Sequence, residues 1–208
     1  SARVARKTLG ALKSARIEDD RDRVARDVMA ESLATSVEQF EAGEHLRNLA
    51  ILGSPIQEIR MIFDLMATES EEDWRNIASR LALVPLGLAG YRQALMEGRR
   101  QGRVGTRRQA ANCAEQAAAW SGQKEDQPPF FLSFLDAYDR SPVRSDALRK
   151  DIERGVRMAT RAYAELREFL LETYLPVAEK GDAVGSERYG LFARVYNGIE
   201  LDLEDTYR

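Results

Sequence analysis

The chain has 208 residues, of which 44% are hydrophobic and 31% are charged, a composition typical of a folded globular protein. Its 31 basic and 34 acidic residues leave a net charge of −3, which excludes a general attraction to nucleic acid or an anionic membrane. The single cysteine, Cys113, excludes an intrachain disulfide framework and favours a reducing, cytoplasmic location. No run of roughly 18 apolar residues occurs, so we expect no membrane span.

The first 17 residues contain five basic residues and no acidic residue. Because chain termini are often loosely held, residues 1–19 are predicted to form a basic arm or a short amphipathic helix. Residues 20–208 are predicted to form a single helical domain. Its first helix is expected from Asp20 to Phe40, where apolar residues recur mostly at steps of three or four, at Val24, Val28, Met29, Leu33, Val37 and Phe40.

The next two helices are predicted from residues that favour helix starts. Ser54 and Pro55 suit the N-cap and the first helical position of a helix over residues 54–66. Thr68 and Glu71 have the spacing of a capping box, in which side chain and backbone bond reciprocally, and they predict the start of a further helix.

Pro85 interrupts the apolar pattern of that further helix, so we expect a kink or two helices that meet at an angle. A turn rich in glycine and arginine is predicted over residues 98–105. Thr106 and Gln109 form a second capping-box pattern, which opens a helix that extends through Trp120.

The second half of the chain is predicted to contain the longest helix. Residues 121–129 are typical of a loop, and the apolar stretch FFLSFLDAY after it predicts a short helix. Ser145 is expected to cap a helix that runs to about Tyr174, with apolar residues advancing by close to ~3.5 positions, as in long packed antiparallel helices. A last helix is expected from Ser186, and its aromatic stripe is predicted to pack in the core, at Tyr189, Phe192 and Tyr196.

No stretch alternates apolar and polar residues over the length of a half-buried strand. No repeat at a fixed period is present either. The sequence therefore predicts an all-α protein, an extended antiparallel bundle of about seven to nine helices with a long helix in its C-terminal half.

The inventory of metal-binding residues is small, with one histidine, His45, and one cysteine, Cys113. A catalytic zinc needs about three converging protein ligands, so these two residues cannot build a His- or Cys-based zinc site. His45 is interpreted as a surface residue near a helix end, although Glu41 and Glu44 are close to it in sequence. Cys113 lies in an alanine-rich helical stretch and is interpreted as a small buried residue, not as a reactive thiolate.

Two charged clusters are candidate sites, and each has a simpler interpretation. Carboxylates that could bind magnesium, or instead stabilise a helix start, are Glu18, Asp19, Asp20 and Asp22. Guanidinium groups that could bind an anion together with the helix N-terminus near Thr106 are Arg99, Arg100, Arg103, Arg107 and Arg108. The simpler interpretation of these arginines is a solvated turn.

Several short motifs occur in a characteristic order. They are SPIQEIR, FDLM, EDW, RL, VP and GY, then an L-x-x-G-x-x-x-G pattern, FLLETYLP, and the stretch from Ser186 to Tyr189. In this order they resemble the N-terminal half of a bacterial family, the domain of unknown function eight-eight-five. The resemblance covers roughly residues 20–205.

That family resembles the zincin metallopeptidases, and its members are generally longer, mostly helical, and carry an H-E-x-x-H-type zinc motif in their second half. The motif is absent here, so the resemblance assigns no zinc ligand or catalytic residue to this chain. It implies that zinc is bound by a missing C-terminal part. It also implies that this chain is the N-terminal part of an uncharacterised metallohydrolase, a peptidase, whose helices wall the substrate cleft without being catalytic alone.

The alternative is a stand-alone helical binding or scaffolding module, because helical bundles commonly present grooves to partners. Under the first hypothesis the partner is the missing C-terminal half or an apolar protein surface, and an apolar face should be left uncovered. We expect neither nucleic acid nor a membrane as a partner, and a homo-oligomer is compatible with both hypotheses.

Overall fold

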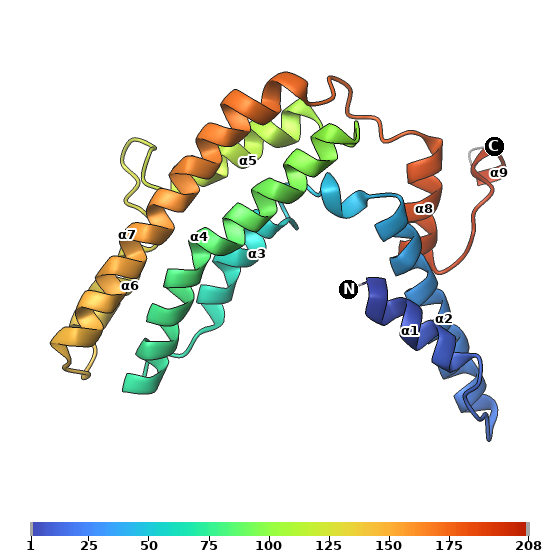
Figure 1. The fold of residues 1–208 in the computed structure, drawn as a ribbon, viewed down its shortest axis with the longest axis horizontal. Coiled ribbons are helices and arrows are strands. Elements are labelled where there is room, and N and C mark those ends of the chain that lie inside the picture. Colours follow the sequence, from blue (N-terminus) through green and yellow to red (C-terminus); the bar gives the residue numbers. More distant parts are fainter. Residues whose placement is uncertain (1, 207–208) are drawn as a thin grey trace. The chain divides into compact units, whose positions relative to one another are not determined.

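The structure is a computed structural model that describes residues 2–206, and within that range it contains nine α-helices and no β-strand (Figure 1). The prediction of an all-α fold is confirmed. Contacts divide the chain into two compact units, residues 46–182 and residues 1–45 with 183–208, a division that the sequence did not suggest. Within the described range, every helix is too short or too polar to cross a bilayer.

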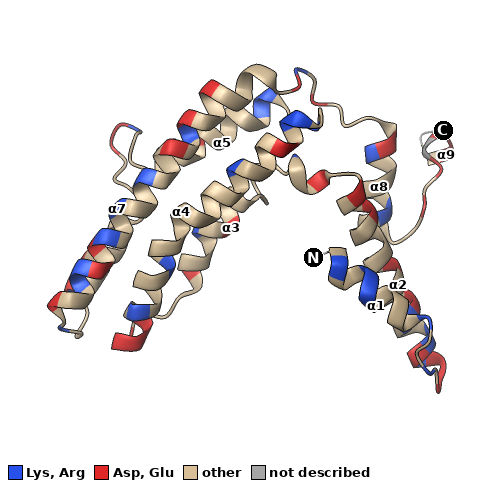
Figure 2. Ribbon diagram, in the orientation of Figure 1, with Lys and Arg blue, Asp and Glu red and all other residues tan. Residues whose placement is uncertain are grey.

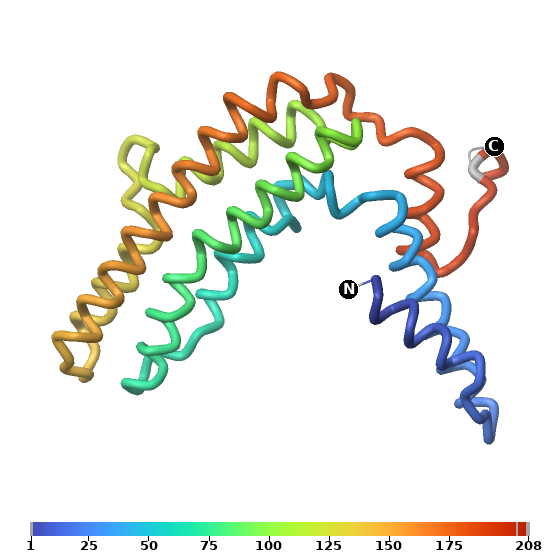
Figure 3. Tube along the Cα trace, viewed as in Figure 1, coloured from blue at the N-terminus to red at the C-terminus, as the bar shows by residue number. Residues whose placement is uncertain are grey.

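The larger unit, residues 46–182, is built on two long helices, α4 (Glu71–Arg100) and α7 (Asp146–Glu168). They lie side by side and run in the same direction (Figures 1 and 3). Gly155 permits this close approach, because a Cβ atom there would lie 2.7 Å from the Cβ of Leu81. The core around the contact contains the fully buried side chains of Trp74, Ile77, Leu81, Leu88, Ile152, Tyr163 and Leu166.

Three shorter helices complete this unit, and each runs antiparallel to the long helix on which it packs. α3 (Pro55–Met61), continued by the 3-10 turn Ile62–Leu65, packs on α4. α5 (Arg107–Trp120) and α6 (Leu132–Arg140) pack on α7 (Figure 3). The helix starts predicted at Ser54 and Pro55 and the loop predicted over residues 121–129 are confirmed.

The apolar line predicted for the long helix is confirmed as its buried face, at Leu148, Ile152, Val156, Ala159, Tyr163 and Leu166. Beyond α7 the helix widens into a π-helix, Phe169–Tyr174, and then closes as a 3-10 turn, Leu175–Val177. The wider turn buries both rings of Phe169 and Tyr174. The outer face of α7 carries charges of alternating sign (Figure 2), many of them in ion pairs three or four positions apart, as expected of a solvated face.

Two expectations about α4 are corrected. The prediction of two separate helices at Pro85 is wrong, because α4 continues through this residue as one element. A proline inside a helix loses a backbone hydrogen bond, and here the buried side chains of Leu81, Val84 and Leu88 on either side of it offset that loss. The turn predicted from residue 98 also begins later, because α4 ends at Arg100.

The start of α4 was predicted at the wrong capping box. Ser70, and not Thr68, is the N-cap, and its hydroxyl accepts a hydrogen bond from the Asp73 backbone N–H at 3.2 Å. The Asp73 carboxylate accepts in return from the Ser70 N–H at 2.9 Å. The T-x-x-E stretch from Thr68 and the S-x-x-D stretch from Ser70 both fit the capping-box pattern, and the chain forms the one that starts at Ser70.

The smaller unit contains α1 (Ala2–Leu12), α2 (Asp20–Glu41) and α8 (Ser186–Asn197), with the short α9 (Leu203–Thr206) near the chain end. Both α1 and α8 pack on α2. The short helix expected within residues 1–19 is therefore present, and so is the helix expected from Asp20.

The apolar stripe of α2 is largely uncovered. Val24, Val28 and Met29 are 60%, 65% and 49% exposed, and the one buried residue of α2 is Thr35. Ion pairs supply much of the contact instead, including one between Arg6 of α1 and Glu41 of α2 at 2.9 Å. The smaller unit therefore has little hydrophobic core of its own.

Candidate functional site

His45 lies exposed in the 3-10 turn after α2. Its ring stacks on Phe40, with centroids 4.2 Å apart and planes 5° apart. The neighbouring carboxylates are engaged elsewhere, since Glu44 accepts hydrogen bonds from Arg188 at 3.0 and 2.7 Å and Glu41 pairs with an arginine of α1. Over residues 2–206, no group of three or more His, Cys, Asp and Glu side chains is arranged to hold a metal ion.

The zinc ion that the family resemblance implies does not fit the residues of this chain. Cys113 is buried in α5, where its thiol donates a weak hydrogen bond to the carbonyl oxygen of Ala50 at 3.4 Å. Burial raises the pKa of this thiol to about 12, so it stays protonated at neutral pH and is a poor metal ligand. The interpretation of Cys113 as a buried residue is confirmed. His45, stacked on Phe40, has no second imidazole with which to share an ion.

The acidic cluster before α2 forms the start of that helix. Asp19 is the N-cap, and its carboxylate accepts two backbone hydrogen bonds from the first turn, at 2.8 and 2.9 Å. Asp22 accepts from the backbone N–H of Glu18 at 3.0 Å, and Asp20 pairs with Arg23 at 2.9 Å. These contacts agree with the interpretation that the cluster stabilises a helix start.

The five arginines predicted as an anion site fall on three adjoining segments: the last turn of α4, the first turn of α5, and the turn between them. Arg100 pairs with Glu97 at 2.6 Å, and Arg108 pairs with Asp182 at 3.2 Å. Arg99, Arg103 and Arg107 are the other three members. Carboxylates therefore already neutralise part of this cluster.

The N-terminus of α5 is also partly occupied. The backbone N–H of Arg107 donates to the carbonyl oxygen of Glu179 at 2.8 Å, and that of Gln109 donates to the Thr106 hydroxyl at 3.4 Å. Thr106 is confirmed as the N-cap. The Gln109 side-chain oxygen is buried without a hydrogen-bond partner, so the reciprocal half of the predicted capping box is not formed. Anion binding at this cluster stays a prediction.

The prediction that the aromatic stripe of α8 packs in the core is wrong. Tyr189 and Tyr196 are 43% and 83% exposed, and the buried residue of α8 is Ala193. Phe192 stacks on Tyr196, with ring centroids 6.5 Å apart. The helical spacing correctly predicted that the three aromatic residues share one face of α8. The face that packs inward is the one with the small side chain of Ala193, because Arg194 fixes the helix on α2.

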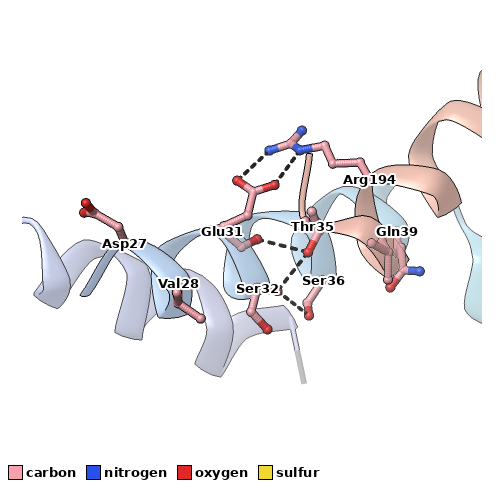
Figure 4. A pocket seen from close by; sticks show the side chains of 10 residues that line it. Asp27, Val28, Glu31, Ser32, Thr35, Ser36, Gln39 and Arg194 are labelled. Atoms are coloured by element: carbon pink, nitrogen blue, oxygen red, sulfur yellow. Dashed lines mark hydrogen bonds and ion pairs between the residues drawn. The ribbon is translucent and has the colours of Figure 1, made fainter. Parts of the chain in front are cut away.

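A groove of about 410 Å³ lies between α2 and α8 in the smaller unit (Figure 4). Arg194 spans it, donating to Glu31 at 2.6 Å and to Glu38 at 2.9 Å. The hydroxyls of Thr35 and Ser36 donate instead to carbonyl oxygens of their own helix, at 3.0 and 2.8 Å (Figure 4). Most of the polar groups that line this groove are thus engaged in contacts within the protein.

The contact between Glu31 and Arg194 should depend on pH. The hydrogen bond from Arg194 lowers the pKa of Glu31 below its ordinary value. Because the folded pKa is the lower one, the stabilisation is complete above the ordinary pKa and is lost as the pH falls through the folded value. Carbon NMR titration of the Glu31 carboxyl should give a midpoint below the ordinary range, and Arg194→Gln should raise it. Equal midpoints in both proteins would contradict this assignment.

A second groove, of about 210 Å³, lies between α3 and α4 in the larger unit. Its lining is almost wholly apolar and includes Ile59, Phe63, Val84 and Gly87. Sequence reasoning missed it, although α4 carries more apolar positions than one buried face needs, at Leu81, Leu83, Val84, Leu86 and Leu88. A count of that surplus would have indicated a second apolar face.

Comparison with protein families gives a match over residues 1–208 to the family described as "Bacterial protein of unknown function (DUF885)". The chain belongs to this family. Membership in DUF885 confirms the resemblance found in the sequence motifs and extends it over the whole chain. No curated protein matches the chain. The family description assigns no activity to DUF885.

Proposed function

We propose that this chain is the helical N-terminal segment of a zincin-like metallohydrolase that acts on peptides, in which it walls the substrate cleft and is not catalytic by itself. The family match gives membership in DUF885 and no activity, and the proposal adds to it the likeness to zincin metallopeptidases that the order of the sequence motifs implies. The reaction class rests on this analogy, since fold alone does not determine chemistry.

The observation that carries the proposal is apolar surface left uncovered on both units. On α4 of the larger unit, Leu83 and Leu86 are 58% and 71% exposed. On α2 of the smaller unit, Val24 and Val28 are 60% and 65% exposed. Contiguous apolar surface of this kind marks interaction sites. A catalytic part that packed on either face would bury it, and the helices of that face would then border the substrate cleft.

The zinc ligands would come from polypeptide outside this chain. A catalytic zinc needs about three protein ligands, and the chain supplies one histidine and one cysteine. Of these, Cys113 is buried with a raised pKa and His45 is stacked on Phe40. The contribution of this chain is therefore a packing surface and a cleft wall.

The test compares the purified 208-residue chain with the product of the complete reading frame from which it comes. We expect the 208-residue chain to take up no equimolar zinc in calorimetry and to leave quenched fluorescent peptides uncleaved. The complete product should bind zinc and cleave them. Tight equimolar zinc uptake by the 208-residue chain would overturn the proposal, and so would a reading frame that ends at Arg208.

A second candidate function is a stand-alone helical binding module, and the groove between α3 and α4 favours it. That groove has an apolar lining and needs no catalytic partner to bind a helix. A complete gene product that binds partners but takes up no zinc would favour this second function over the first.

A further inference from the structure

The volume of the groove between α3 and α4 suits protein side chains better than a small molecule. Its volume of about 210 Å³ is below the roughly 300–1,000 Å³ typical of pockets for small molecules. A small ligand would therefore be poorly enclosed. One or two aliphatic side chains from another protein would fill the space.

The groove has a buried floor and an apolar rim. Phe63 and Val84 are 4% and 3% exposed and form the floor, while Ile62 and Leu83 on the rim are 42% and 58% exposed. Gly87 makes the groove deep, because a Cβ atom there would lie 3.2 Å from the Cδ1 of Ile59. A buried floor flanked by an exposed apolar side chain on each side forms the kind of groove in which the apolar face of a helix packs.

One cation lines this groove, and it has no carboxylate partner in the part of the chain that the structure describes. Arg80 is exposed beside Leu83, and residues 76, 77, 83 and 84, three and four positions from it, are all uncharged. Arg75 and Arg100 of α4 are paired in this way, with Glu71 and Glu97. An apolar groove with an unpaired guanidinium at its edge is complementary to an aliphatic side chain flanked by a carboxylate.

We propose that the α3–α4 groove binds an amphipathic helix of a partner protein, which inserts aliphatic side chains spaced three or four positions apart and pairs a flanking Asp or Glu with Arg80. This proposal rests on the second candidate function, because a catalytic part packed on α4 would cover Leu83. The α1 helix of a second copy is a poorer occupant, because its charged residues are all basic and would repel Arg80.

Fluorescence anisotropy with two labelled synthetic peptides tests the proposal on the whole 208-residue chain. Both peptides are alanine-rich helices of about 16 residues, long enough to form a helix, with leucines along one face. One carries glutamates beside the leucines and the other carries lysines at the same positions. We expect the glutamate peptide to bind about tenfold more tightly than the lysine peptide.

Three variants separate the contributions, and circular dichroism confirms that each is folded. Leu83→Glu should weaken the glutamate peptide about tenfold or more, because it places a charge on the apolar rim. Arg80→Glu should reverse the preference, so that the lysine peptide binds more tightly. Arg75→Glu makes the same charge change on α4 at a residue that does not line this groove, and it should leave the preference intact.

Three results would overturn the proposal. The first is equal binding of the two peptides, and the second is peptide binding that Leu83→Glu and Arg80→Glu leave unchanged. The third is self-association of the chain in analytical ultracentrifugation that Leu83→Glu abolishes, because the occupant would then be a second copy.

Discussion

Replacing Gly98 by alanine should lower the free energy of unfolding of the larger unit by about 3 kcal/mol. Gly98 is buried in the last turn of α4, and an added Cβ atom would press on the carbonyl oxygens of Leu46 and Arg103, the latter at 2.5 Å. Both obstacles are backbone atoms, so no side-chain rotation relieves the clash. The Arg103 N–H also donates to the Gly98 carbonyl at 2.8 Å, which ties the clashing turn to the helix end.

Urea unfolding followed by tryptophan fluorescence measures this effect, because the two tryptophans, Trp74 and Trp120, both lie in the larger unit. Gly90→Ala is the matched control in the same helix, since a Cβ atom there meets nothing within 4 Å. It should stabilise the helix by about 0.5–1 kcal/mol, because alanine loses less backbone entropy than glycine. If Gly98→Ala were as harmless as Gly90→Ala, the close approach at Gly98 would be disproved.

The positions of the helices were largely predictable, because the signals that determine them are local. Ser54, Thr106 and Ser145 are all N-caps as predicted, since a cap depends on a side chain and the three residues after it. The buried face of α7 was predictable for a related reason: one strong 3.5-residue pattern leaves a single face to bury. Pro85 shows the limit of local reasoning, because packing from both sides keeps α4 continuous there.

The coverage of each apolar face was not predictable, because it depends on segments distant in sequence. The stripes of α2 and α8 have helical spacing, yet Val28 and Tyr196 are 65% and 83% exposed. Nothing near either residue in sequence specifies whether another helix covers it. The charged residues did not predict which helices pack together either, since Arg194 pairs with Glu31 and Glu38 more than 150 positions away.

The numbers of histidine and cysteine residues limited the candidate chemistry more than the geometry of the fold did. A single histidine and a single cysteine limit metal chemistry in any fold, and this conclusion needs only the sequence. The α3–α4 groove needs the structure, because Ile59 and Val84 line it from two helices whose contact no local pattern encodes. The surplus of leucines on α4 indicates only that some second face exists.

Replacing Gln116 by leucine should lower the free energy of unfolding of the larger unit by about 2 kcal/mol. Gln116 joins α5 to the segment before α3. Its Nε2 donates to the carbonyl oxygen of Ile51 at 3.0 Å, and its Oε1 accepts from Nε2 of Gln57 at 2.6 Å. Gln57 is itself 5% exposed, and its Oε1 accepts from the N–H and the hydroxyl of Ser54. Leucine would leave a donor and an acceptor without partners beside the buried side chains of Gln57 and Ser54.

The cost arises because an unpaired buried polar group loses its hydration without compensation, whereas an exposed one re-forms its bonds with water. Gln101→Leu is the matched control, since Gln101, the residue after the end of α4, donates to Glu97 at 2.7 Å on the exposed surface. The same substitution there should change the free energy of unfolding by less than about 0.5 kcal/mol. Equal effects at the two positions in urea unfolding would mean that water reaches the Gln116 network. Hydrogen exchange should then find the backbone before α3 equally protected in both variants. A selective loss of protection in Gln116→Leu is the result expected if this network holds that segment in place.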